Sequence, residues 1–190
     1  MFGHLHLNEC SNNDPFKSQI LKDKQLLDLI KVCEFSLKDK WTLLYRGSRD
    51  GFGAANFHAK CDNHKNTLTI LKAHDTSYIF GGFTSVTWNG SYQYKSDPNA
   101  FLFSLTNRDN RPCKIRQINT TKSIYCNSEY GPIFGGGNDI RIANNANTTM
   151  GSYSNLSHSY YQHPQPSQGN SYLAGSYQFN LSEIEVYQKE

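Results

Sequence analysis

The segment Trp41–Cys61 reads WTLLYRGSRDGFGAANFHAKC and says more about the fold than any other part of the chain. It begins with a short apolar run, Trp41–Tyr45, which is typical of a β-strand. Two glycines then bracket the polar residues of Arg46–Gly51, and this predicts a turn. The small and apolar residues of Phe52–Lys60 predict a helix. Strand, charged turn and helix therefore follow one another directly.

Composition narrows the class of protein. The chain has 190 residues, which suits a single domain. It contains 12 Tyr, 11 Phe and 14 Gly with only 2 Met, a balance that favours strands and turns over a helical bundle. The net charge of +3 is not concentrated in any dense basic cluster, so we expect no nucleic-acid surface.

The cysteines and the hydropathy pattern indicate the setting. Five cysteines, an odd number without a CxxC pair, support neither a disulfide framework nor a zinc site. No secretory leader is recognisable, and no apolar run approaches the length that spans a membrane. We therefore expect a cytoplasmic protein with no metal, no cofactor and no membrane insertion.

Periodicity outside the opening segment predicts one further helix and several strands. Apolar residues at three- and four-residue spacing predict an amphipathic helix between Ser18 and Cys33. Alternation predicts a half-buried strand at Thr67–Leu71, and Tyr78–Phe80 enters another that ends at Gly81-Gly82. Ala100–Leu105 is apolar throughout, which indicates a strand buried on both faces.

The second half of the chain continues in short strands. They are expected at Lys114–Ile118, at Ser123–Cys126, on both sides of a glycine bend within Pro132–Ile142, and in a closing stretch from Tyr177 to Tyr187. Many short strands with few helices predict a mainly β, α+β fold, with two packed antiparallel sheets (a β-sandwich) flanked by short helices. We expect a mobile lead-in at residues 1–17, a single domain at 18–190, and a long loose loop at 144–176.

Several motifs, in this order, resemble one known family. They are Leu43–Phe52, Phe57-His58-x-x-Cys61-Asp62-Asn63, Phe80–Phe83 with Trp88, Ala100–Leu105, Gly131–Gly137 and Ile184–Tyr187. Together they resemble the TLDc domain, from about Ser18 to Tyr187. The resemblance implies a β-sandwich, a link to oxidative-stress resistance and binding of the vacuolar-type proton-pumping ATPase. It supplies no catalytic residues, because the family has no agreed ones. The loop at 144–176 departs from the family pattern in length and in its Tyr, Gln and His content.

The charged turn is the candidate partner-binding site. Loops held by a rigid scaffold often carry recognition, and this turn presents Arg46, Ser48, Arg49 and Asp50, with Phe52 as an apolar anchor. The alternative is a structural ion pair that fixes the turn.

Two further motifs admit a chemical interpretation. Cys61 and His58 lie three residues apart on one predicted helical face and could form a thiol–base pair, although such residues more often belong to the core. Gly135-Gly136-Gly137 lacks the Lys-Ser/Thr that a phosphate-binding loop needs, so a bend in a sheet explains it better.

Taken together, the sequence favours a non-enzymatic protein-interaction domain. The two alternatives are a direct thiol-based antioxidant enzyme and an adaptor module for signalling proteins.

Overall fold

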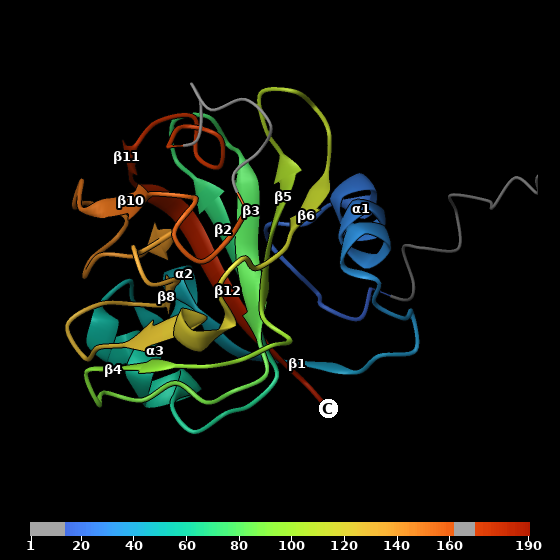
Figure 1. Ribbon diagram of the computed structural model, residues 1–190. Helices are drawn as coiled ribbons and strands as arrows, with labels where there is room; N and C mark the ends of the chain where they lie inside the picture. The colour runs from blue at the N-terminus through green and yellow to red at the C-terminus, as the bar shows by residue number, and fades with distance from the viewer. Residues whose placement is uncertain (1–13, 162–169) are drawn as a thin grey trace, which may run out of the picture.

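The computed structural model describes residues 14–161 and 170–190. In this part of the chain two six-stranded antiparallel sheets pack face to face (Figure 1). The strand order is β1-β12-β2-β3-β5-β6 in the first sheet and β11-β10-β9-β8-β7-β4 in the second. The predicted mainly β, α+β sandwich with short flanking helices is confirmed.

The first sheet has the longer strands. They are β1 (Trp41–Arg46), β2 (Thr67–Ala73), β3 (Ile79–Thr84), β5 (Phe101–Thr106), β6 (Cys113–Ile115) and β12 (Leu181–Lys189). The last of these, β12, lies between β1 and β2 and pairs antiparallel with both. The last described strand of the chain thus lies inside the first sheet, next to its edge strand β1.

The second sheet is built from short strands. They are β4 (Gln93–Lys95), β7 (Ile124–Cys126), β8 (Ile133–Phe134), β9 (Ile140–Arg141), β10 (Ser152–Ser154) and β11 (Gln178–Phe179). The helices are α1 (Asp23–Cys33), α2 (Gly47–Asp50), α3 (Ala54–Cys61) and the 3₁₀ helix η2 (Thr120–Lys122). None of these described helices has the length and apolar character needed to cross a bilayer.

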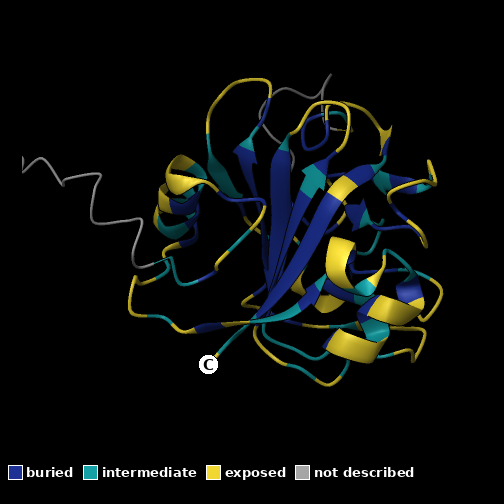
Figure 2. Ribbon diagram, turned by 180° about the vertical axis from the view of Figure 1, so that it is seen from behind, coloured by how far each residue is buried: buried dark blue, intermediate teal, exposed yellow. Residues whose placement is uncertain are grey.

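Two apolar clusters hold the layers together. The larger lies between the sheets, where Phe80, Phe134 and Trp88 are all buried. The smaller lies on the outer face of the first sheet, where Leu26 and Leu29 of α1 pack over it. Figure 2 shows the strands of the first sheet buried along most of their length, with α1 beside them.

Strand β5 shows why the first sheet is buried on both faces. Side chains alternate across a strand, so Phe101, Phe103 and Leu105 belong to the cluster under α1. Leu102 belongs to the cluster between the sheets. The predicted two-sided burial of this strand is confirmed. The expected strand at Thr67–Leu71 is present as part of β2, but its expected half-burial is wrong, since all five residues are buried.

Two local predictions need correction. Strand β3 does not end at Gly81-Gly82 but runs through both glycines to Thr84. A Cβ at Gly81 would clash with the carbonyl oxygen of Thr69, and one at Gly82 would lie 2.8 Å from the Phe134 ring, so these glycines permit close packing within the strand. The expected turn after β1 contains a short helix, α2.

The segment expected as a loose loop, residues 144–176, is largely packed where it is described. It contributes β10 to the second sheet, and Leu156, Tyr160 and Leu173 to the core between the sheets. Its apolar residues have no regular period, which is why the pattern did not reveal their burial. Residues 162–169 of this prediction lie outside the described part of the chain.

The expected lead-in, residues 1–17, is described only from residue 14. Within it Phe16 is 2% exposed, and its ring centroid lies 4.9 Å from that of Trp41 and 5.0 Å from that of Tyr187. The last residues of the lead-in therefore pack on the first sheet rather than moving freely.

Candidate functional site

The candidate partner-binding residues surround α2, which joins β1 to α3. The backbone N–H of Arg46 donates to Oδ2 of Asp50 at 2.9 Å, which joins the residue before this four-residue helix to its last residue. Gly47 is buried, and a Cβ there would come within 2.6 Å of the Phe52 ring. Gly51 ends the helix with φ at +99°, a conformation that glycine adopts without strain. Steric constraints thus explain why glycine occupies both positions of the motif.

Arg46 points away from the surface. It lies opposite Glu185 in the pairing of β1 with β12, and its Nε donates to Oε1 of Glu185 at 2.8 Å. The Arg46 side chain is 12% exposed and that of Glu185 is 0% exposed. Burial opposes the charged guanidinium, but the ion pair with Glu185 outweighs it and raises the pKa of Arg46. Arg46 therefore has a structural role.

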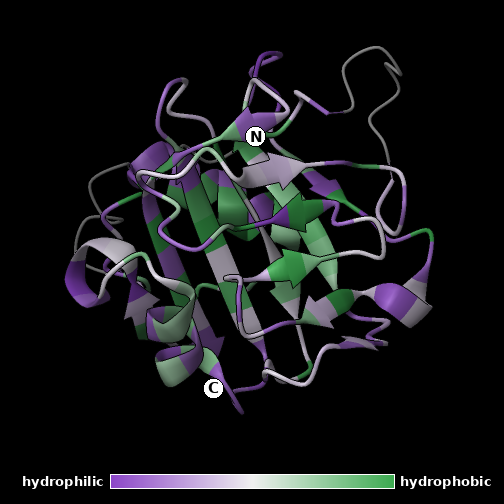
Figure 3. Ribbon diagram, turned by 90° about the vertical axis from the view of Figure 1, so that its left-hand side faces the viewer, coloured by the Kyte–Doolittle hydropathy of each residue, from purple (hydrophilic) through white to green (hydrophobic). Residues whose placement is uncertain are grey.

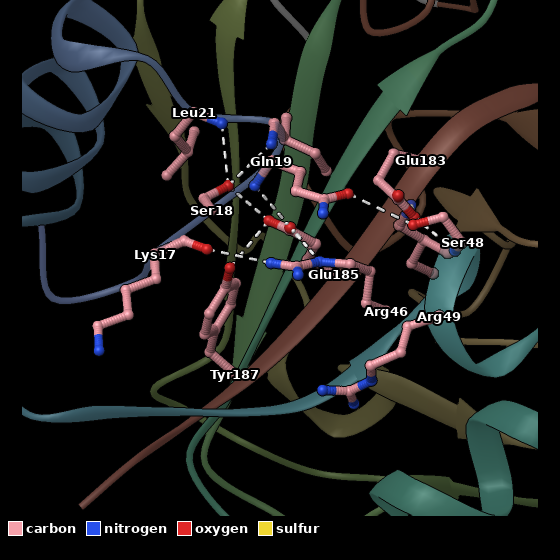
Figure 4. A network of polar contacts seen from close by, with 12 residues as sticks. Lys17, Ser18, Gln19, Leu21, Arg46, Ser48, Arg49, Glu183, Glu185 and Tyr187 are labelled. Atoms are coloured by element: carbon pink, nitrogen blue, oxygen red, sulfur yellow. Dashed lines mark hydrogen bonds and ion pairs between the residues drawn. The ribbon is translucent and has the colours of Figure 1, made fainter.

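Glu185 is the centre of a larger polar network (Figure 4). Besides Arg46, its carboxylate accepts hydrogen bonds from the hydroxyl of Ser18, the backbone N–H of Gln19 at 2.9 Å and the hydroxyl of Tyr187 at 2.9 Å. Burial and the adjacent carboxylate raise the pKa of Tyr187, which keeps its hydroxyl a donor. The network fastens the segment before α1 onto the sheet.

Arg49 is the exposed cation of the site. Its side chain is 46% exposed, and its guanidinium donates to both oxygens of Asp50, at 3.0 and 2.8 Å. A third bond joins it to the carbonyl oxygen of Leu44 at 2.9 Å. The hydrogen bonds from Arg49 outweigh burial and hold the pKa of Asp50 below its ordinary value. Arg49 is thus accessible and fixed in orientation.

Ser48 and Phe52 differ from each other in exposure. Ser48 is exposed, and its backbone N–H donates to Oε1 of Glu183 at 3.1 Å. Phe52 is half-buried and packs against the core between the sheets. The five candidate residues lie together, but only Ser48 and Arg49 present exposed side chains.

His58 and Cys61 share α3, yet their side chains have different surroundings. His58 Nδ1 lies 2.8 Å from Oδ1 of Asp62, and its Nε2 donates to the carbonyl oxygens of Asn127 and Tyr130 at 3.0 Å. Cys61 is 0% exposed and lies in the core. His58 thereby joins α3 to residues 127–130.

The described thiols share one electrostatic environment. Burial raises the pKa of all four of them, Cys33, Cys61, Cys113 and Cys126. A reactive thiol requires the reverse, a lowered pKa together with access to solvent. The geometry therefore argues against a thiol–base pair of Cys61 with His58.

Sequence reasoning missed the acidic half of the network around α2. Glu183 and Glu185 occupy the closing strand, where a charged residue is unusual because β12 is covered on both sides. Two glutamates that alternate with the apolar residues Ile184 and Val186 were the signal in the sequence. Ser18 and Gln19, which bind Glu185, give no such signal.

Comparison with known proteins identifies the family. The sequence model of the TLDc domain matches residues 15–190. Similar relatives include the MTOR-associated protein MEAK7 of Mus musculus, 28% identical over 91 residues, which are 45% of this chain and 20% of that protein. The Gallus gallus protein of that name is 36% identical over 69 residues, 36% of this chain and 14% of the relative.

The Homo sapiens MTOR-associated protein MEAK7 is 25% identical over 88 residues, which are 43% of this chain and 19% of the relative. The matches thus span a fifth or less of each of these longer relatives. The family model, in contrast, extends from the segment before α1 to the end of the described chain, and the chain belongs to the TLDc domain family.

Proposed function

We propose that this TLDc domain is a non-enzymatic protein-interaction module whose partner contacts the surface around α2. The supporting observation is Arg49, whose half-exposed guanidinium is held by Asp50 and by the carbonyl of Leu44. A guanidinium fixed before binding loses little conformational freedom when a partner carboxylate arrives. Ser48 lies beside it with an exposed side chain.

The family and the similar proteins each suggest a function for this module. The family resemblance favours the vacuolar-type proton-pumping ATPase, with a role in oxidative-stress resistance and a cytoplasmic location. The relatives described as MTOR-associated favour an adaptor function in signalling. Either function needs an exposed recognition surface and no catalytic group.

Binding measurements on purified proteins test this proposal. The full chain is immobilised, and its affinity for isolated vacuolar-type ATPase, and separately for mTOR, is compared between wild type, Arg49→Ala and Arg108→Ala. Arg108 is an exposed arginine on the loop between β5 and β6, so it controls for loss of charge. Arg49→Ala should weaken binding by about 1–3 kcal/mol, the truncation cost of an interface hot spot.

Arg108→Ala should leave the affinity unchanged. A large fall in melting temperature for Arg49→Ala, with full affinity per folded molecule, would instead make the turn structural. Absence of binding to both partners would remove them as candidates.

A further inference from the structure

The outer face of the second sheet carries aromatic and basic side chains. Its strands expose alternate residues, and pairing places Tyr153 opposite Arg141 and Tyr94 opposite Tyr125. Ile140, the residue before Arg141 in β9, points into the core between the sheets. Figure 3 looks onto this sheet, with the first sheet behind it.

Arg141 lies between two tyrosine rings. Its guanidinium carbon is 4.2 Å from the ring centroid of Tyr153 and 4.6 Å from that of Tyr130. Tyr177 stacks on Tyr153 with a centroid separation of 5.3 Å. Arginine between aromatic faces is stabilised by cation–π attraction, and its hydrogen-bond donors remain in the plane of the guanidinium. We call Tyr130, Arg141, Tyr153 and Tyr177 the tyrosine–arginine ladder.

Other contacts fix the ladder in place. The Asn138 side chain donates to the hydroxyl of Tyr153 at 2.6 Å. The carbonyl oxygen of Tyr130 accepts from His58, which connects the ladder to α3. The Tyr153 ring is therefore held through its hydroxyl, and the backbone of Tyr130 through His58, before any ligand binds.

The guanidinium of Arg141 has donors to spare. Within the described residues it donates once, to the carbonyl oxygen of Gly151 at 3.3 Å, although arginine carries five N–H groups. Its Nε is buried without a partner there, and no carboxylate of the described chain lies within ion-pair distance. The positive charge thus has no internal counter-ion in that part of the chain.

A second cation lies on the same sheet. Lys122 Nζ is 5.0 Å from the ring centroid of Tyr94, and the Tyr94 and Tyr125 rings pack in a tilted arrangement with their centroids 4.7 Å apart. Tyr94 is itself held by a hydrogen bond from its hydroxyl to the carbonyl oxygen of Gly136. The sheet therefore repeats the combination of a cation with paired tyrosines.

We propose that the tyrosine–arginine ladder binds an acidic peptide segment of a partner protein, with Arg141 receiving one of its carboxylates. Planar N–H donors match a carboxylate in two-point contact, and the flanking rings exclude water from that bond. Lys122 gives the same segment a second basic contact. This surface lies on the second sheet and differs from the one around Arg49, so the two proposals stand or fall separately.

Fluorescence anisotropy with the full chain tests the assignment. The probe is a labelled ten-residue peptide in which glutamate alternates with serine, and the reference peptide has glutamine in place of glutamate. We expect the glutamate peptide to bind about tenfold more tightly or better. Arg141→Gln should abolish that preference, whereas Arg108→Gln, with the same loss of charge, should change it less than about twofold.

Arg141→Lys separates geometry from charge. It keeps the charge but loses the planar fork, so its affinity should fall about fivefold or more. An unchanged affinity in Arg141→Lys, or equal losses in Arg141→Gln and Arg108→Gln, would overturn the proposal, as would equal binding of both peptides. Tighter binding of a phosphoserine peptide than of the glutamate peptide would overturn the choice of carboxylate. If Arg141→Gln fails to fold by circular dichroism, the lysine variant still decides.

Discussion

The outer faces of the two sheets are built in contrasting ways. On the first sheet α1 and the segment before it cover an apolar cluster, and the charged groups Arg46 and Glu185 satisfy each other. On the second sheet Arg141 and Lys122 lie against tyrosine rings, and neither forms an ion pair within the described chain. The contrast teaches that the buried Arg46–Glu185 pair is matched internally, whereas Arg141 and Lys122 on the second sheet have no counter-ion within the described chain.

The largest effect should come from the covered face. Phe103 is 0% exposed beneath α1, so Phe103→Ala should lower the free energy of unfolding by about 3–5 kcal/mol through lost burial and a cavity. Urea denaturation followed by circular dichroism measures this. Tyr153→Ala on the open face is the matched comparison and should cost less than half as much. Equal costs would mean that the second sheet is covered as well.

Next in size is the ion pair beneath the segment before α1. Glu185→Gln removes the charge that balances the 12%-exposed Arg46, and about 2–4 kcal/mol should be lost, as when one partner of a buried pair is removed. A double-mutant cycle with Arg46→Ala isolates the contribution of the ion pair. The coupling free energy between the two residues should exceed about 1 kcal/mol, the upper limit for exposed pairs. If the free-energy losses of the two single variants simply add in the double variant, the polar network does not join the segment before α1 to the first sheet.

A third test concerns the four described cysteines, of which Cys33, Cys61 and Cys126 are buried. Iodoacetamide should label Cys61 about a hundredfold more slowly in the native protein than in urea, because labelling requires local opening of the core. Peptide mapping by mass spectrometry distinguishes it from the half-buried Cys113, which should react sooner. Labelling of native Cys61 at the unfolded rate would revive the antioxidant alternative.

The smallest effect should come from the open face. Lys122 lies over Tyr94 at the surface, and an exposed cation–π contact stabilises by about 0.5–1 kcal/mol. Lys122→Ala should therefore shift the melting temperature only slightly, while it weakens binding of the glutamate peptide. A shift as large as that of Glu185→Gln would place Lys122 among the structural charges and remove the contrast between the faces.

The fold was predictable where a strand or helix leaves a local pattern in the sequence. The strand at Ala100–Leu105 was predicted from its continuous apolar run, and the helix α1 from apolar residues that recur at three- and four-residue spacing. The prediction of a loose loop after Asn144 was wrong because Leu156 and Tyr160 are buried singly, without the period of a strand or helix. Burial of that kind depends on the surrounding tertiary structure.

The candidate site was predictable only in part. The cluster of charge and glycine around Arg49 could be found from its local composition, and the structure assembles it around α2. The partner of Arg46 could not, because Glu185 lies 139 positions away and is brought near only by the pairing of β1 with β12. The same holds for Arg141 and the tyrosines around it, which come from separate strands and loops.

The position of β12 has a consequence for how the protein is made. During synthesis β1 and β2 emerge early, yet the strand that joins them is the last of the described elements to leave the ribosome. Until then two unpaired strand edges and the apolar side chains beside them are open to solvent. Such nascent chains fold slowly and associate readily with chaperones or with one another. A chain stalled on the ribosome before Leu181 would contain nearly all of the core residues, but β1 would lack its pairing partner in the first sheet.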